Sequence, residues 1–234
     1  MSARSLQLVV AIGALLAYAP TAPAQQVAYA ASALSELDSV TQAAVVRELG
    51  RARTRGLPVQ PLVAKVREGQ IKRAAPERIR HAVAALTTRL DSARSALGAA
   101  SNAAELVAGA DAIAAGVNQA ALHAVRAASG ERDVSAPLGA LAQLVASGVP
   151  VRRATQMIVE LVKRDAGPRE ILAFGIAVES DVGAGVPAEE SALFRLRAIE
   201  SGAAGGATTL STGIGDPVTI PTSPGDARRP RRKP

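Results

Sequence analysis

Gly148-Val149-Pro150 is the stretch that decides the fold, and Gly56-Leu57-Pro58 and Gly185-Val186-Pro187 repeat its pattern. A glycine suits the left-handed position just past a helix end, and a proline suits the first turn of the next helix. The apolar residue between them can fold back onto the helix that has just ended. Each triplet therefore predicts a helix end, a buried contact and a new helix in quick succession.

Other residues mark helix boundaries outside the triplets. Gly116-Val117-Asn118 follows the same pattern, with asparagine in place of proline as the opening residue. Asn102 is expected to cap another helix, and Gly69 is expected to interrupt the helix that Pro58 opens. The structural helix corners that we predict are Gly56, Pro58, Pro76, Gly116, Gly148, Pro150, Pro168, Gly185 and Pro187.

Between the corners, apolar residues recur at intervals of three and four, which is the spacing of an amphipathic helix. No stretch alternates convincingly as a strand would. We therefore predict an all-α domain, an array or compact bundle of about eight to nine short helices joined by tight Gly-x-Pro corners. The residues expected on buried faces are Leu34, Leu37, Val40, Ala44, Val45, Val59, Leu62, Val63, Val66, Ile79, Ala82, Val83, Leu86, Leu90, Leu106, Ala110, Ile113, Val117, Ala121, Leu122, Val125, Leu138, Leu141, Leu144, Val145, Val151, Ala154, Ile158, Leu161, Val162, Ile171, Leu172, Ile176, Leu193, Leu196 and Ile199.

A spacing of 92 residues relates the first part of the domain to the second. It carries Pro58 onto Pro150 and Pro76 onto Pro168. This match predicts two duplicated halves, at about residues 37–128 and 129–200, or a short solenoid of stacked helical hairpins. The alternative is that glycine and proline mark the helix ends of the two parts independently, without duplication, because alanine-rich helices align readily by chance.

The chain begins with the pattern of a secretory signal peptide. A positive residue precedes the apolar run Leu6–Leu16, and Ala22-Pro23-Ala24 supplies small residues at a cleavage site. We predict that residues 1–24 are removed and that the mature chain starts at Gln25. The run is 11 residues long, whereas a bilayer span needs roughly 20. The mature protein is therefore expected to be periplasmic or secreted, without a transmembrane span. An uncleaved anchor is the alternative.

The composition changes near residue 201. Residues 201–234 are rich in Gly, Ser, Thr and Pro, so they cannot bury enough apolar surface to offset the entropy of ordering, and we predict a disordered tail. We expect the basic cluster at its end to tether the protein weakly to an anionic envelope surface, with an inert solubilising tail as the alternative. The tether residues are Arg228, Arg229, Arg231, Arg232 and Lys233.

Composition excludes several kinds of chemistry. The chain has no cysteine, so disulfides and thiolate metal sites are ruled out. Of its net charge of +7, the body between the signal segment and the tail carries only +3, and aromatic residues make up 2%. Nucleic-acid binding is therefore not expected, because both a basic stripe and stacking aromatics are missing. The basic residues in the first half of the body allow two interpretations. They could form a surface that docks an acidic partner, or they could belong to an ordinary solvated helical exterior.

The residue types that carry catalysis are few. His81 and His123 have no second histidine at metal-binding spacing, and we expect both to be solvated or to flank the core. Glu189-Glu190 follows a proline, where a carboxylate stabilises the start of a helix. We find no nucleophile-elbow or phosphate-loop motif. No catalytic, cofactor or metal residue is therefore predicted.

These features predict an exported, non-enzymatic α-helical interaction or scaffold protein of the bacterial cell envelope. Grooves between short helices would hold a protein or peptide partner. One alternative is a carboxylate-dependent hydrolase or lyase of the periplasm that uses Glu160 or Glu170. Another is a structural or stress-related protein with no fixed ligand.

Overall fold

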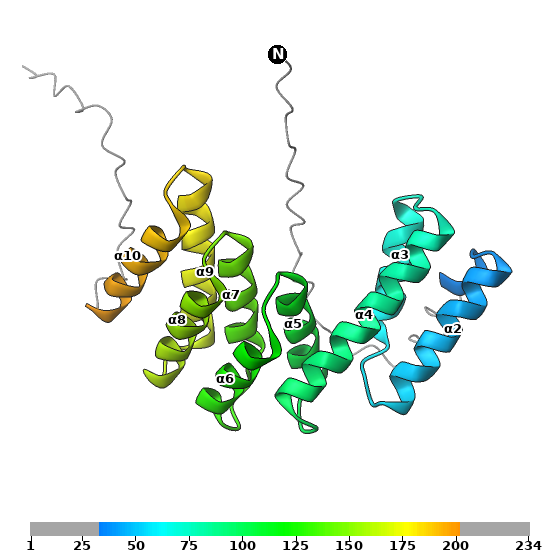
Figure 1. Cartoon of the computed structure of the whole chain (residues 1–234), viewed down its shortest axis with the longest axis horizontal. Helices are drawn as coiled ribbons and strands as arrows, with labels where there is room; N and C mark the ends of the chain where they lie inside the picture. Colours follow the sequence, from blue (N-terminus) through cyan, green and yellow to red (C-terminus); the bar gives the residue numbers. More distant parts are fainter. Residues whose placement is uncertain (1–32, 202–234) are drawn as a thin grey trace, which may run out of the picture.

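The computed structural model describes residues 33–201, and within that range the chain is helical and has no strand (Figure 1). A short helical turn at residues 33–35 comes first. The helices that follow are α2 (Ser39–Thr54), α3 (Gln60–Ile71), α4 (Pro76–Leu97), α5 (Ala103–Ala114), α6 (Gln119–Ser129), α7 (Ser135–Ala146), α8 (Val151–Lys163), α9 (Pro168–Gly183) and α10 (Ala188–Glu200). The all-α prediction is confirmed. The expected signal peptide and basic tail lie outside the described residues.

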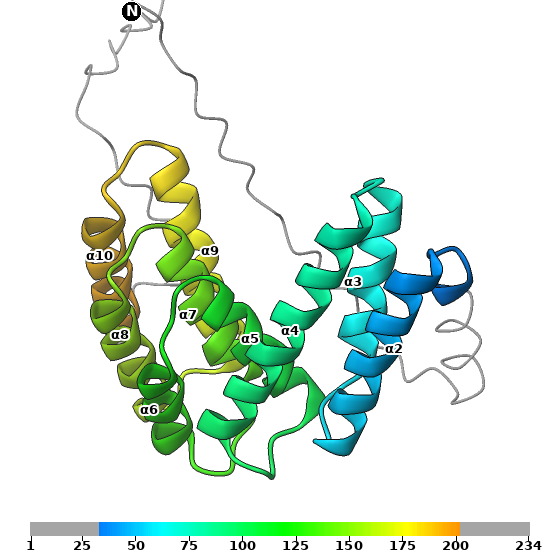
Figure 2. The ribbon, with the colours of Figure 1, turned by 45° about the vertical axis from the view of Figure 1, so that its right-hand side comes forward.

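The helices form two layers. α5, α7 and α9 pack side by side in one layer, and α4, α6 and α8 pack side by side in the other. At one end α2 and α3 pack on α4, and at the other end α10 packs on α9. The array bends, with α5, α7 and α9 on the inner side and α6, α8 and α10 on the outer side (Figure 2). The apolar core runs between the layers, as it does in stacked helical hairpins.

The glycine of each predicted triplet ends a helix in the left-handed region. The φ angle is 64° at Gly56, 100° at Gly148 and 94° at Gly185. The next residue closes the turn, since the backbone N–H of Val149 donates to the carbonyl oxygen of Leu144 at 3.0 Å. The apolar residues of the three triplets are at most 9% exposed. The predicted combination of helix end and buried contact is therefore confirmed at all three corners.

The two predicted asparagine caps are also confirmed. Gly116 has a φ of 101°, and the side-chain oxygen of Asn118 accepts a hydrogen bond from the backbone N–H of Ala121 at 2.9 Å. Asn102 accepts from the backbone N–H of Glu105 at 3.0 Å. Each cap satisfies an N–H group that the first helical turn leaves without a backbone partner.

The prolines fall into two groups. Pro76 and Pro168 are the first residues of α4 and α9, as predicted. Pro150 and Pro187 instead lie at the N-cap, one residue ahead of α8 and α10. Proline fits this position because its φ is fixed near −65° while ψ is free to be extended. At Pro150 the ψ angle is 135°.

Two predictions about α3 are wrong. Pro58 does not open this helix, which begins two residues later at Gln60 with Pro61 in its first turn. Gly69 does not interrupt the helix but lies inside it. A Cβ atom at Gly69 would be 2.7 Å from Cγ1 of Ile79, so this glycine lets α4 approach closely.

Two helix ends are left-handed without a glycine, and no residue pattern predicted them. Arg73 follows α3 with a φ of 50°, and Asp165 follows α8 with a φ of 56°. These residues are 92 apart, which agrees with the spacing that relates the two proposed halves. The correspondence between residues 92 apart ends within the next helix of each half. That helix is α4 in the first half, with 22 residues, and α9 in the second, with 16. Duplication of the two halves stays a prediction.

The predicted buried faces are confirmed for most residues, and three residues depart from the prediction. Leu138 and Ile158 are 0% exposed, as expected for core positions. Val40 is instead 65% exposed, Ile176 59% and Leu193 36%. Val40 and Leu193 lie on the end helices α2 and α10, whereas Ile176 lies on the side of α9 that also exposes Ala173 and Ser180.

The corner geometry makes a direct prediction about stability. Replacing Gly116 by Ala should lower the free energy of unfolding by about 1–2 kcal/mol, because an L residue is strained at its positive φ. No atom lies within 4 Å of the added Cβ, so crowding does not contribute. Gly50 is the matched control. It lies inside α2 with equally open space, and alanine there should raise stability by about 0.5–1 kcal/mol. Urea unfolding of both variants checks the difference, and equal effects would contradict it.

Candidate interaction site

The open side of α5, α7 and α9 is lined mainly by small side chains, and we call this surface the inner face. The opposite side of each helix packs on its neighbours, so the exposed positions recur every three or four residues. The exposed or half-buried residues of the inner face are Ala104, Val107, Asp111 and Ala114 of α5, Ser135, Gly139, Ala142 and Ala146 of α7, and Arg169, Ala173, Ile176 and Ser180 of α9. Such side chains let a partner approach closely to the helix backbones.

Asp111 on α5 and Arg169 on α9 are the charged residues of that set. Desolvation by the surrounding helices raises the pKa of the Asp111 carboxyl group, although the residue reaches solvent, while Arg89 and Lys65 act through space in the opposite direction. Lys65 forms its ion pair with Glu68, at 2.6 Å. The Nε atom of Arg89 is buried and has no hydrogen-bond partner among the described residues. The α4–α5 junction therefore has an anionic and a cationic group that a bound molecule could satisfy.

Close contact between α7 and α9 keeps this part of the inner face continuous. A Cβ atom at Gly175 would lie 2.6 Å from the side-chain oxygen of Gln143 and 3.5 Å from Cα of Ala140. The amide nitrogen of Gln143 donates to the carboxylate of Glu179 on α9. A side chain at residue 175 would therefore displace the amide of Gln143 from its present position, whereas the contact with the backbone of α7 would stay at van der Waals distance.

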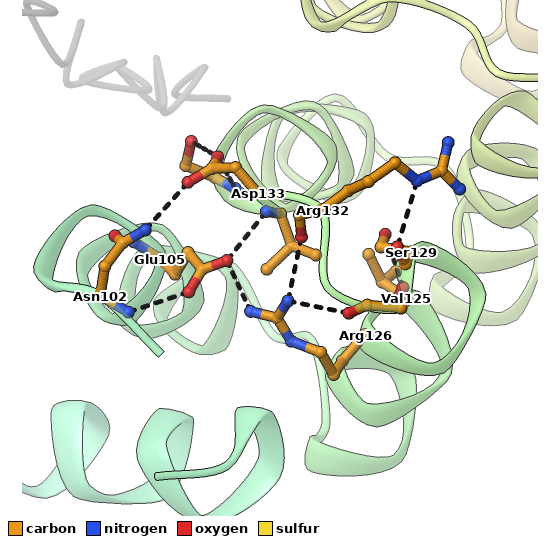
Figure 3. Close-up of polar contacts among 10 residues, drawn as sticks. Asn102, Glu105, Val125, Arg126, Ser129, Arg132 and Asp133 are labelled. Atoms are coloured by element: carbon orange, nitrogen blue, oxygen red, sulfur yellow. Dashed lines mark hydrogen bonds and ion pairs between the residues drawn. The ribbon is translucent and has the colours of Figure 1, made fainter. Parts of the chain in front are cut away.

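A buried carboxylate fixes α5 against its neighbours (Figure 3). Glu105 is 4% exposed and accepts hydrogen bonds from Nη2 of Arg126 at 2.6 Å and from the backbone N–H of Val134 at 3.1 Å. Its other oxygen accepts from the backbone N–H of Asn102 at 2.9 Å, which completes a capping box. One side chain therefore joins the start of α5, the end of α6 and the segment before α7.

A second arginine extends this network toward α8. Arg132 donates to the carbonyl oxygen of Ser129 at 3.1 Å within the same turn (Figure 3). It also donates to the carbonyl oxygen of Val162 at 3.2 Å and forms an ion pair with Asp165 at 2.6 Å. The carbonyl groups at the ends of α6 and α8 thus share one cationic partner, which complements the negative ends of both helix dipoles.

The carboxylates considered for catalysis lie apart from this network. Glu160 pairs with Arg164 on its own helix at 2.9 Å, and Glu189 pairs with Arg153 at 3.2 Å. Glu170 is exposed in the first turn of α9. No hydrogen bond or ion pair within residues 33–201 joins these acids to one another.

Both histidines are exposed, His81 on α4 and His123 on α6, in agreement with the solvated environment predicted for them.

A separate hollow of about 330 Å³ lies beside α3 where the described chain begins. The side-chain amide of Gln70 donates to the carbonyl oxygen of Ala33 at 2.8 Å. Glu36, Arg67 and Ile71 complete the lining. This hollow belongs to the α2–α3 end of the array rather than to the inner face.

Residues 33–201 contain no group of three His, Asp or Glu side chains placed to hold a metal ion. No helix in this part of the chain combines the length and hydropathy that a membrane span requires. The tether residues from Arg228 to Lys233 lie outside the described range. No family model, curated protein or solved structure matches the chain.

Proposed function

We propose that this chain is an exported, non-enzymatic interaction or scaffold protein of the bacterial cell envelope, and that it holds a protein or peptide partner on its inner face. The observation that carries the proposal is a surface of small side chains around the unpaired carboxylate of Asp111. A partner helix or strand that brings a Lys or Arg side chain to Asp111 would gain a charge-assisted hydrogen bond in a partly desolvated place.

Arg89 supports the same interpretation. Its buried Nε atom has no partner among the described residues, and an orphaned buried donor costs free energy until it is satisfied. The charge of Arg89 also acts through space on Asp111, so the α4–α5 junction holds one cationic and one anionic group. A bound segment that carries charge would be oriented by these two groups.

Two further parts of the proposal rest on the sequence alone. Export depends on the predicted signal peptide at residues 1–24, and loose attachment to an anionic surface depends on the basic cluster at the end of the tail. The hydrolase alternative gains no support from Glu160, since Arg164 already occupies its carboxylate.

Site-specific crosslinking in the cell envelope tests the proposed function. A photoreactive residue at Ala104 on the inner face should give a discrete crosslinked partner. The matched control is Ala127, an exposed alanine on the outer helix α6, which should not give that partner. Adding Asp111→Lys should reduce the yield at residue 104 by about tenfold, because like charges replace an attraction. The same product from both positions, or from neither, would contradict inner-face binding.

A further inference from the structure

Four of the five large exposed apolar side chains of the described residues lie at the two ends of the array. Val40 and Val46 lie on α2, Ile71 ends α3 and Leu193 lies on α10, whereas Ile176 on α9 belongs to the inner face. Their exposed fractions run from 36% at Leu193 to 83% at Ile71. The helices between, α4 to α8, have none. In stacked helical arrays, an end face without a polar cap is a surface on which another unit can stack.

The two ends also carry opposite charge. Residues 39–71, which span α2 and α3, hold six Lys and Arg against two Glu, a net charge of +4. Residues 168–200, which span α9 and α10, hold six Asp and Glu against three Arg, a net charge of −3. These helices lie at opposite ends of the molecule (Figure 1). Complementary potentials of this kind steer two surfaces together and fix their register.

On α2 the cations stand beside the exposed apolar residues. Arg47 follows Val40 by seven residues, and Arg53 follows Val46 by seven, so each arginine lies two turns along the same side of the helix. Both arginines are exposed. The ion pairs of this helix use other arginines, so these two cations are available to an acidic surface.

On α10 the exposed leucine lies next to an acid. Glu190 precedes Leu193 by one turn and is exposed, and the ion pairs of this helix use its other glutamates. Arg197 lies one turn further along the same side, so the acidic part of this face is its N-terminal half. The neighbouring helix α9 adds Glu170, which is exposed in its first turn.

We propose that copies of this chain associate end to end, with the α9–α10 end of one copy stacked on the α2–α3 end of the next. A second copy fits because its opposite end supplies both the missing apolar neighbour and the complementary charge. Two different faces meet in such a heterologous contact, so each added copy leaves a free face and the assembly can grow. An envelope scaffold could thereby present several inner faces in a row.

Two variants of the mature full-length chain, each blocked at one end, test this proposal. The first carries Val46→Glu and Arg47→Glu on α2, and the second carries Glu190→Lys and Leu193→Lys on α10. All four side chains are exposed, so both variants should keep the helical circular dichroism of the wild type. Ala127→Glu on α6 is the control, because it adds a charge away from both ends.

Sedimentation velocity at rising protein concentration gives the readout. The wild type and the control should form larger species, less so as salt is added, because salt screens the charge attraction. Each end-blocked variant should associate at least about tenfold more weakly. An equimolar mixture of the two variants should form a one-to-one dimer and nothing larger, since one intact face remains on each.

Three outcomes would overturn the proposal. A wild type that is monomeric at every concentration would show that the two ends do not associate. Association that survives both end-blocked variants would place the contact elsewhere. If the two variants fail to pair when mixed and the wild type forms nothing larger than a dimer, the contact would be a symmetric one between identical faces. None of these results affects the crosslinking at residue 104, which tests partner binding separately.

Discussion

Replacing Glu105 by Ala should lower the free energy of unfolding by about 3–5 kcal/mol. The substitution removes the acceptor for Arg126 and for the backbone N–H groups of Val134 and Asn102. The guanidinium of Arg126 is only 19% exposed, so water cannot fully replace its lost partner. Because the same carboxylate joins α5 to the start of α7, the loss should also loosen the inner face.

Chemical denaturation of the purified variant measures this effect, and Glu160→Ala provides the control. Glu160 and Arg164 form an exposed pair on one helix, with side chains about equally accessible at 45% and 46%. Exposed pairs of this kind contribute about 0–1 kcal/mol. Similar losses in the two variants would show that Glu105 acts as an ordinary surface acid, contrary to the network in Figure 3.

The second large effect is expected at Asp181, where α9 meets α10. Arg195 donates two hydrogen bonds to its carboxylate, at 2.8 and 2.7 Å, and the hydroxyl of Ser191 donates a third at 2.6 Å. Asp181 is 8% exposed and Ser191 is 0% exposed. Asp181→Ala should therefore cost about 3 kcal/mol of unfolding free energy, because it leaves buried donors without this acceptor.

The same site predicts a pH dependence. Hydrogen bonding to Arg195 holds the pKa of Asp181 below its ordinary value. A carboxyl group with a lower pKa in the folded state adds stability above its unfolded pKa of about 3.9 and loses it as pH falls through the folded pKa. The wild type should thus lose stability below about pH 4 more steeply than Asp181→Asn.

Thermal melts from pH 7 to pH 2 provide the measurement for Asp181. Glu189→Gln is the control, since its pair with Arg153 is about half exposed on both sides. It should leave the stability at neutral pH within about 1 kcal/mol of the wild type. Parallel pH curves for the wild type and Asp181→Asn would contradict the role given to this carboxylate.

Local backbone chemistry explains which parts of the fold were predictable. Gly148 and Gly185 marked helix ends because a left-handed residue strongly favours glycine, and Asn118 marked a cap because its side chain can replace a backbone acceptor. Arg73 and Asp165 adopt the same left-handed conformation without the residue type that signals it. In each turn the backbone N–H of the next residue closes the helix end, from Ala74 to the carbonyl oxygen of Gly69 and from Ala166 to that of Leu161, so the conformation follows from backbone hydrogen bonds that the residue type does not signal.

Long-range packing explains what the sequence missed at the site. Glu105 and Arg126 are 21 residues apart, so their pairing follows from how α5 and α6 stack and not from helical spacing. The one sequence pattern that pointed to this site is the spacing of three residues between Asn102 and Glu105, which is typical of a capping box. Likewise, the helical spacing of Leu193 predicted burial, but periodicity cannot tell an end helix from a central one.

Partner binding at the inner face is the central proposal, and hydrogen exchange of the protein tests it most directly. The backbone amides should be followed by mass spectrometry with and without the partner that crosslinks at residue 104. Slower exchange in α5, α7 and α9, with α6 and α8 unchanged, is the predicted result. Protection confined to α6 and α8, or no change in any helix, would contradict the assignment.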